Sequence, residues 1–354
     1  MSQKINKKNL LFLSLSILAI TAGALSIFFL PERFFYDAIT ISKDFYNEKG
    51  WIGSYPFSMK FYHITGLNRI HFSIVALIQL PILFYILYRL GLPKRFYILT
   101  VRNILVYISF LMIAIFISMP SKEFITFIIL SIIPFLFKRK KLPLWKTVAL
   151  SFLILILFGI WFRAYFILLI PIAIIMHLIS FIKFRNRIAT VVFSGLLIAI
   201  FMSLSYGVVK GEFLSQSTRE ELNERRIGED ASNSIILSPI ATDTFHGEAF
   251  GIVYGFFSVN VPVNGLKFIL SPQILAFVIW QLFLIVCLLL NFRTTLDNRK
   301  KYRYEIWIFY FVFGYFIIQG VFEPDLGSAI RHKMGIFPLI YFALYYDYFR
   351  RQVQ

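Results

Sequence analysis

Ionisable residues occur in three short connections between apolar segments, at positions where solubility does not require charge. They are Lys122 and Glu123, Arg163, and the group Glu323, Asp325, Arg331 and His332. An ionisable residue inside a membrane costs roughly 2.5 to 3.5 kcal/mol on insertion scales, so such residues usually pair or line a polar cavity. We therefore expect the three groups to share one polar pocket. The alternative is that Lys122 and Arg163 extend to lipid phosphates, while Glu123 only neutralises Lys122.

These residue types suit the transfer of a sugar from a lipid diphosphate. Arginine offers a diphosphate a bidentate fork and lysine a point charge, whereas a carboxylate can deprotonate a sugar hydroxyl. In this hypothesis Glu323 or Asp325 activates the acceptor hydroxyl, with Glu123 as the alternate base. The residues assigned to the departing diphosphate, where negative charge grows, are Arg331, Arg163, Lys122 and His332. His332 could equally be an interfacial histidine.

Several common enzyme motifs are absent from the sequence. It has no G-x-x-x-x-G-K-[ST], G-x-G-x-x-G, H-E-x-x-H or G-x-S-x-G, which disfavours ATP hydrolysis, dinucleotide use, zinc proteolysis and serine hydrolysis. No Asp-x-Asp pair occurs either, so a metal-dependent reaction with a nucleotide sugar is disfavoured. The single cysteine, Cys287, excludes an intramolecular disulfide and a cysteine-rich metal site. We expect no metal and no soluble cofactor.

The composition is that of an integral membrane protein. Of the 354 residues, 58% are hydrophobic and only 15% are charged, against roughly a quarter charged in a soluble domain. Ten apolar runs lie between the charged clusters, and each is a candidate membrane helix. Their ranges are 10–30, 71–88, 103–119, 124–137, 148–162, 164–182, 188–208, 272–290, 306–322 and 334–346. The expected fold is one all-α membrane domain, 1–354, with about ten transmembrane helices.

Basic residues are distributed unevenly between the two sides of this topology. With the N-terminus in the cytoplasm, the inner segments hold 22 of the 36 lysines and arginines but only 3 of the 18 acidic residues. This pattern obeys the positive-inside rule and predicts that both termini are cytoplasmic. The net charge of +18 is thus explained by topology and by anionic inner-leaflet lipid. No nucleic-acid partner is expected.

Two outer segments are long. Residues 31–70 mix aromatic and charged side chains, and we expect amphipathic pieces that lie on the bilayer surface. We expect residues 209–271 to form a large late periplasmic loop that begins with a polar helix and ends in a Gly- and aromatic-rich ordered loop packed on the bundle. Near the N-terminus, Ala22-Gly23-Ala24 imitates a signal-cleavage site. Apolar character continues to Leu30, so we expect the first span to be retained.

Three segments carry a resemblance to a known family: Pro120-Ser-Lys-Glu123, Arg163-Ala-Tyr165 and above all Glu323-Pro-Asp-Leu-Gly-Ser-Ala-Ile-Arg-His332. In these segments the chain resembles the bacterial O-antigen and capsular polysaccharide polymerases. The chain also resembles this family in its size, its number of predicted spans and its large late loop, so the resemblance covers the whole chain, although the motifs are loose. The Arg-x10-Gly pattern of some members is absent from 209–271, so no role is transferred from it.

The resemblance implies a multi-pass protein of the bacterial inner membrane. Such a protein would polymerise oligosaccharide repeat units linked to undecaprenyl diphosphate into O-antigen or capsule on the periplasmic face. Its partners would be that lipid-linked oligosaccharide, the bilayer, a chain-length regulator and a flippase.

Two other functions fit the same sequence. An O-antigen ligase is also a multi-pass glycosyltransferase with the same donor, and differs in its acceptor. A lipid-linked oligosaccharide flippase or other transporter belongs to a different class, in which inverted repeats with broken spans are common. No such symmetry is visible here.

Overall fold

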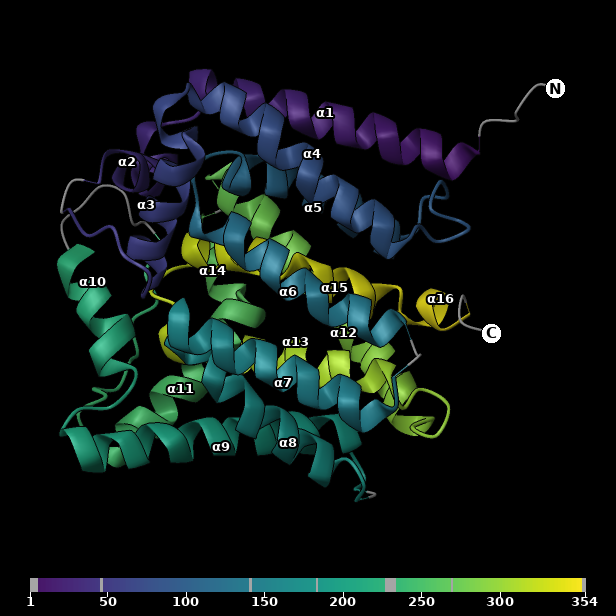
Figure 1. The fold of residues 1–354 in the computed structure, drawn as a ribbon. Helices are drawn as coiled ribbons and strands as arrows, with labels where there is room; N and C mark the ends of the chain where they lie inside the picture. The colour runs from purple at the N-terminus through teal and green to yellow at the C-terminus, as the bar shows by residue number, and fades with distance from the viewer. Residues whose placement is uncertain are drawn as a thin grey trace. The chain divides into compact units, whose positions relative to one another are not determined.

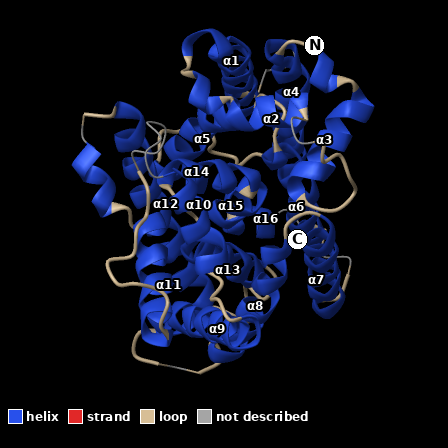
Figure 2. Cartoon of the chain, turned by 90° about the vertical axis from the view of Figure 1, so that its left-hand side faces the viewer, coloured by secondary structure: helices blue, strands red, loops and turns tan. Residues whose placement is uncertain are grey.

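Helices make up the regular structure of this protein (Figures 1 and 2). The computed structural model describes residues 6–44, 47–139, 142–182, 184–226, 234–268 and 270–351. No strand occurs in these ranges, so the all-α prediction is confirmed for them. The chain divides into two compact units, residues 1–164 with 331–354, and residues 165–330. The 3-10 helix η3 (Ala164–Leu168) and helix α14 (Leu326–Gly335) contain the boundaries between the units.

The first unit is built on long helices near the N-terminus. Its elements are α1 (Lys7–Phe29), η1 (Glu32–Phe34), α2 (Tyr36–Lys43), α3 (Ser54–Thr65), η2 (Leu67–Arg69), α4 (Phe72–Leu90), α5 (Val101–Ile117), α6 (Lys122–Lys138), α7 (Leu144–Trp161), α15 (Phe337–Leu344) and α16 (Tyr346–Arg351). Helix α1 packs against α4 and α5, and α6 packs against α4, α7 and α15. Gly23 permits the contacts of α1 with α4 and α5, because a β-carbon there would lie 2.5 Å from Leu80 Cδ1 in α4 and 3.1 Å from Ala114 O in α5.

The second unit surrounds one apolar helix. Its elements are α8 (Leu169–Ile179), α9 (Arg187–Lys210), the π-helical turn η4 (Gln216–Glu220), α10 (Glu221–Arg226), α11 (Phe245–Asn260), η5 (Val263–Phe268), α12 (Pro272–Asp297) and α13 (Glu305–Phe322). Helix α13 packs against α8, α9, α11 and α12. Nearly all of its residues are buried, as expected for a helix that is apolar on every side.

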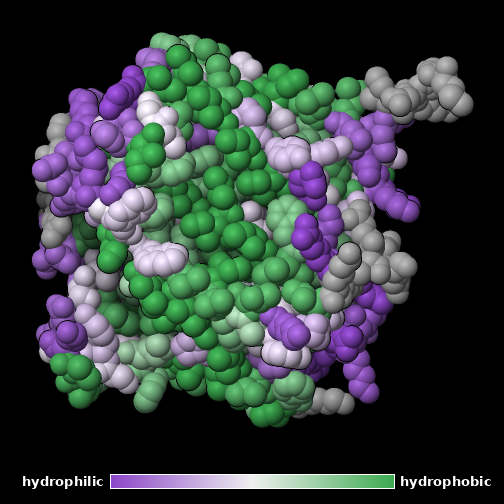
Figure 3. Space-filling model, in the orientation of Figure 1, coloured by the Kyte–Doolittle hydropathy of each residue, from purple (hydrophilic) through white to green (hydrophobic). Residues whose placement is uncertain are grey.

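Within the described residues, six helices are long and apolar enough to cross a membrane, namely α1, α4, α7, α9, α12 and α13. Helix α5 and residues 164–179 are apolar but shorter. Helix α1 exposes Leu13, Ile17 and Leu18, each by 56%, and hydrophobic side chains cover the part of the first unit formed by α1 and α4 (Figure 3). These features indicate a multi-pass helical membrane protein. The predicted count of ten spans and the cytoplasmic position of both termini remain predictions.

The last predicted span, 334–346, is interrupted in the structure. Helix α14 ends at Gly335, α15 begins at Phe337 and ends at Leu344, and α16 follows after Tyr345. Pro338 lies in the first turn of α15, where its missing N–H is tolerated but a helix cannot continue from before it. The apolar run is therefore split into short helices.

Residues 245–260, in the late loop, form helix α11 rather than the expected ordered loop. Gly247, Gly251 and Gly255 recur every four residues and so share one face of this helix. A β-carbon on Gly255 would lie 2.1 Å from Gly320 O of α13, and one on Gly320 would lie 2.6 Å from Phe256 N. The glycines thus allow the two backbones to approach closely, as small residues do between membrane helices. The sequence alone predicts a loop at these glycines, so the helix is a correction of that expectation.

Candidate functional site

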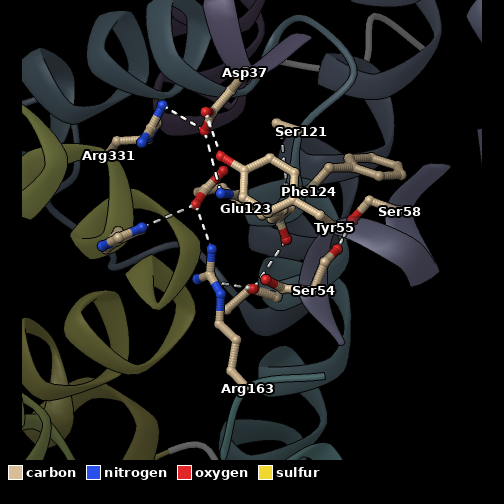
Figure 4. A network of polar contacts seen from close by, with 12 residues as sticks. Asp37, Ser54, Tyr55, Ser58, Ser121, Glu123, Phe124, Arg163 and Arg331 are labelled. Carbon is tan, nitrogen blue, oxygen red and sulfur yellow. Dashed lines mark hydrogen bonds and ion pairs between the residues drawn. The ribbon is translucent and has the colours of Figure 1, made fainter. Parts of the chain in front are cut away.

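A network of charged side chains lies in the first unit, around the beginning of α6 (Figure 4). Its members are Asp37, Tyr55, Lys122, Glu123, Arg163, Arg331 and His332. We call these seven residues the charged cluster. Five of them were predicted as site residues from the sequence, and the structure brings those five together.

Glu123 lies at the centre of the charged cluster and is fully buried. Its Oε1 atom is 2.6 Å from Arg163 Nη2 and 3.4 Å from His332 Nε2. Its other oxygen, Oε2, is also buried and accepts no hydrogen bond from the described residues. Oε2 therefore has capacity for a further hydrogen bond, but a ligand hydroxyl can reach it only after the side chain or its neighbours move.

The start of α6 holds Glu123 in place. Ser121 caps the helix, because its Oγ accepts a hydrogen bond of 3.2 Å from the Phe124 N–H. A carboxylate in the first turn also interacts favourably with the helix dipole. Arg163 lies two residues after the end of α7, and its backbone N–H donates a hydrogen bond of 3.0 Å to Phe158 O. From there its side chain extends to Glu123. Its side chain is only 5% exposed, so this ion pair is largely shielded from solvent.

Asp37 is the second carboxylate of the charged cluster and is not among the site residues predicted from the sequence. Its Oδ2 is 2.6 Å from Arg331 Nη1 and 3.4 Å from Lys122 Nζ, and its Oδ1 accepts a hydrogen bond of 2.7 Å from Tyr55. Burial raises the pKa of Asp37, but Arg331, Lys122, Tyr55 and His332 more than offset this and hold the pKa well below its usual range. Asp37 is therefore ionised at neutral pH.

Charge balance in the sequence does not point to Asp37. The predicted set already has three carboxylates, Glu123, Glu323 and Asp325, beside its three permanent cations, so it requires no further counter-charge. Asp37 lies in the aromatic segment 31–70, close to α1, and nothing local distinguishes it from the other acidic residues there.

Helix α3 completes the charged cluster with the ring of Tyr55. Lys122 Nζ lies 3.5 Å from the centroid of this ring, a favourable cation–π position. Two contacts fix α3: the Gly53 N–H donates to Trp161 O at 2.9 Å, and Tyr62 Oη accepts from the Ser121 N–H at 3.0 Å. The predicted surface segment 31–70 therefore contributes residues to the cluster.

The charged cluster has more cations than anions. Lys122, Arg163 and Arg331 are positive, whereas Asp37 and Glu123 are negative. The net charge of the cluster is therefore +1 when His332 is neutral and +2 when it is protonated. A partly buried group with excess positive charge favours an anionic ligand that several donors bind together.

Glu323 and Asp325 belong to the second unit, where each accepts a hydrogen bond from a residue within four positions in the sequence. Asp325 caps α14, because its Oδ1 accepts from the Ser328 N–H at 2.8 Å and its Oδ2 from Ser328 Oγ at 2.9 Å. Glu323 Oε1 accepts a hydrogen bond of 2.9 Å from Gln319 Nε2. The cap gives Asp325 a structural role, and the predicted catalytic role of both residues remains a prediction.

Comparison with known proteins found no matching family model, no matching curated protein and no matching solved structure.

Proposed function

We propose that this protein is a membrane glycosyltransferase that polymerises oligosaccharide repeat units carried on undecaprenyl diphosphate. The observation that supports this most is the charged cluster, in which three cations surround two carboxylates in a partly buried position. Cations of this kind bind a diphosphate, and a carboxylate among them can remove the proton of a sugar hydroxyl. The resemblance of the sequence to the polysaccharide polymerases supports the same reaction.

In the proposed reaction, the acceptor hydroxyl oxygen attacks the anomeric carbon of the donor sugar. The bond from that carbon to the diphosphate oxygen breaks, and the electron pair leaves with the lipid diphosphate. Arg163, Arg331 and Lys122 stabilise the negative charge that grows there. The hydroxyl proton passes to a carboxylate.

We assign this proton acceptor to Glu123, because it lies beside the cations and has one unpaired oxygen. An incoming diphosphate would compete for Arg163 and so release Glu123 from its ion pair at the moment when a base is needed. Glu323 and Asp325 remain the other candidates for the base. The proposed site faces the periplasm, as the predicted topology requires, in the inner membrane of a bacterium.

The direct test is elongation by the purified protein in detergent, with lipid-linked repeat units extracted from the cells that make it. The wild type is expected to yield a ladder of glycan lengths. Arg163→Ala is expected to lower the rate by about 100-fold or more, the size of effect that removal of a charge-stabilising donor produces. Arg95→Ala, at an exposed arginine outside the charged cluster, is the matched control. An unchanged ladder from Arg163→Ala would remove this residue from the site.

The same assay distinguishes a transporter from a glycosyltransferase, because a pure flippase does not lengthen the glycan in detergent. A deletion strain separates the two transferases. Loss of a polymerase leaves lipopolysaccharide with a single repeat unit, whereas loss of a ligase leaves the bare core.

A further inference from the structure

The second unit has a basic cleft at the end where α8 is joined to α9 and where α12 ends. Its volume is about 630 Å³. It is lined by Arg185, Asn186 and Arg187 at the start of α9, and by Arg293, Leu296 and Asp297 in the last turns of α12. The cleft therefore has three guanidinium groups and one carboxylate.

The carboxylate does not neutralise the cleft. Arg293 Nε is 3.9 Å from Asp297 Oδ2, and the two side chains are 71% and 56% exposed, so this pair contributes little. Arg187 Nη2 donates to Ser180 O at 2.7 Å, whereas its Nε is buried and has no hydrogen-bond partner among the described residues. A buried donor without a partner is costly and indicates a missing acceptor.

Apolar side chains adjoin the basic cleft. Phe184, in the connection from α8 to α9, lines the cleft and is 46% exposed. The two helices that continue from the cleft, α9 and α12, are both long enough to cross a membrane and expose Phe193 and Leu290 by 55% and 60%. A soluble anion would leave these apolar side chains exposed, whereas the acyl chains of a lipid with an anionic headgroup can pack against them.

We propose that the basic cleft binds the phosphodiester of an anionic phospholipid. The guanidinium groups of Arg185, Arg187 and Arg293 contact the phosphate oxygens, and the acyl chains lie along the exposed apolar side chains of α9 and α12. Arginine suits this ligand because its planar fork matches phosphate geometry. Basic pockets between membrane helices on the cytoplasmic side are known to recognise such headgroups, and the predicted topology puts this connection on that side.

The test is native mass spectrometry of the full chain in detergent, titrated separately with phosphatidylglycerol, phosphatidylcholine and inorganic phosphate. The cleft variant combines Arg185→Gln, Arg187→Gln and Arg293→Gln. The matched control combines Lys300→Gln, Lys301→Gln and Arg303→Gln, which removes the same charge at exposed positions of the next connection. We expect the cleft variant to bind phosphatidylglycerol about tenfold more weakly or worse. The control is expected to stay within about twofold of the wild type.

Two outcomes would overturn the proposal. Equal weakening in both variants would show a general charge effect, and inorganic phosphate bound as tightly as phosphatidylglycerol would show a site for a soluble anion. If the triple variant does not insert, Arg293→Gln alone serves the test, since this exposed side chain can be changed without disturbing the fold. It is expected to weaken phosphatidylglycerol binding several-fold and to leave phosphatidylcholine binding unchanged. The proposal is independent of the glycosyltransferase function.

Discussion

Arg331 Nη1 lies 2.6 Å from Asp37 Oδ2, so the short helix near the N-terminus is joined by an ion pair to the C-terminal part of the first unit. The two side chains are 22% and 20% exposed, which makes the pair stronger than one on an open surface. Lys122 and Tyr55 contact the same carboxylate. Four separate stretches of chain, including that of Asp37 itself, therefore meet at this residue. A substitution of Asp37 tests how these stretches are held together, just as a substitution of Glu123 tests the centre of the cluster.

Glu123→Gln removes the charge between Arg163 and His332 but keeps the size of the side chain. If Glu123 is the base, we expect glycan elongation to fall by about 100-fold or more, with normal insertion and a normal pattern of protease fragments. The measurement is the initial rate of elongation by purified protein. Glu123→Asp should keep part of the activity, because it keeps a carboxylate. Full activity in Glu123→Gln would transfer the role of base to another residue.

Glu323→Gln and Asp325→Asn test the two predicted bases of the second unit. With Glu123 as the base, both variants should elongate the glycan within about tenfold of the wild type. Asp325→Asn is expected to keep the helix cap, since asparagine caps almost as well as aspartate, whereas Asp325→Ala should lower stability by about 1 kcal/mol. A rate loss in Glu323→Gln as large as that in Glu123→Gln would contradict the assignment to Glu123.

The lowered pKa of Asp37 predicts how stability depends on pH. A group whose pKa is lower in the folded than in the unfolded state stabilises the fold above its unfolded pKa, and this stabilisation is lost as the pH falls towards the folded value. We expect Asp37→Asn to destabilise the protein by about 1 to 3 kcal/mol at neutral pH. The difference from the wild type should stay constant from about pH 6 to 8 and shrink below about pH 4.

Thermal unfolding in detergent at several pH values measures this difference. Asp347→Asn is the control, because Asp347 forms an ion pair with Arg102 at 3.7 Å in which both side chains are more than a third exposed. Its loss should have little effect at any pH. A gap between wild type and Asp37→Asn that widens in acid would contradict the prediction.

Gly255→Ala tests the close contact between α11 and α13. The added β-carbon would lie 2.1 Å from Gly320 O, so one helix must move. We expect a loss of about 1 to 3 kcal/mol, the usual cost of overpacking, measured by thermal unfolding. Phe257→Ala, at a half-exposed position of the same helix, should have a much smaller effect. Equal effects of the two changes would argue against a tight glycine contact.

The candidate site was only partly predictable from the sequence. Lys122, Glu123 and Arg163 stood out because each is an ionisable residue in a short connection between apolar runs, and that pattern is local. Asp37 did not stand out, because its importance comes from Arg331 and Lys122, which are far from it in the sequence. The close pairing of α11 with α13 was missed for the same reason. Glycines at intervals of four indicate a packed helix face only when the partner, Gly320, is known.

Consecutive residues are enough to predict the helical, apolar character of the chain and the placement of its charges in short turns. These properties follow from hydropathy and from the cost of burying charge, and both are read from consecutive residues. Three features become apparent only in the folded chain: which charges pair, the carboxylate and aromatic ring that segment 31–70 supplies, and the break of the last apolar run after Gly335. Ion pairs and close helix contacts depend on distances in space between residues that are remote in sequence, and only the folded chain fixes those distances.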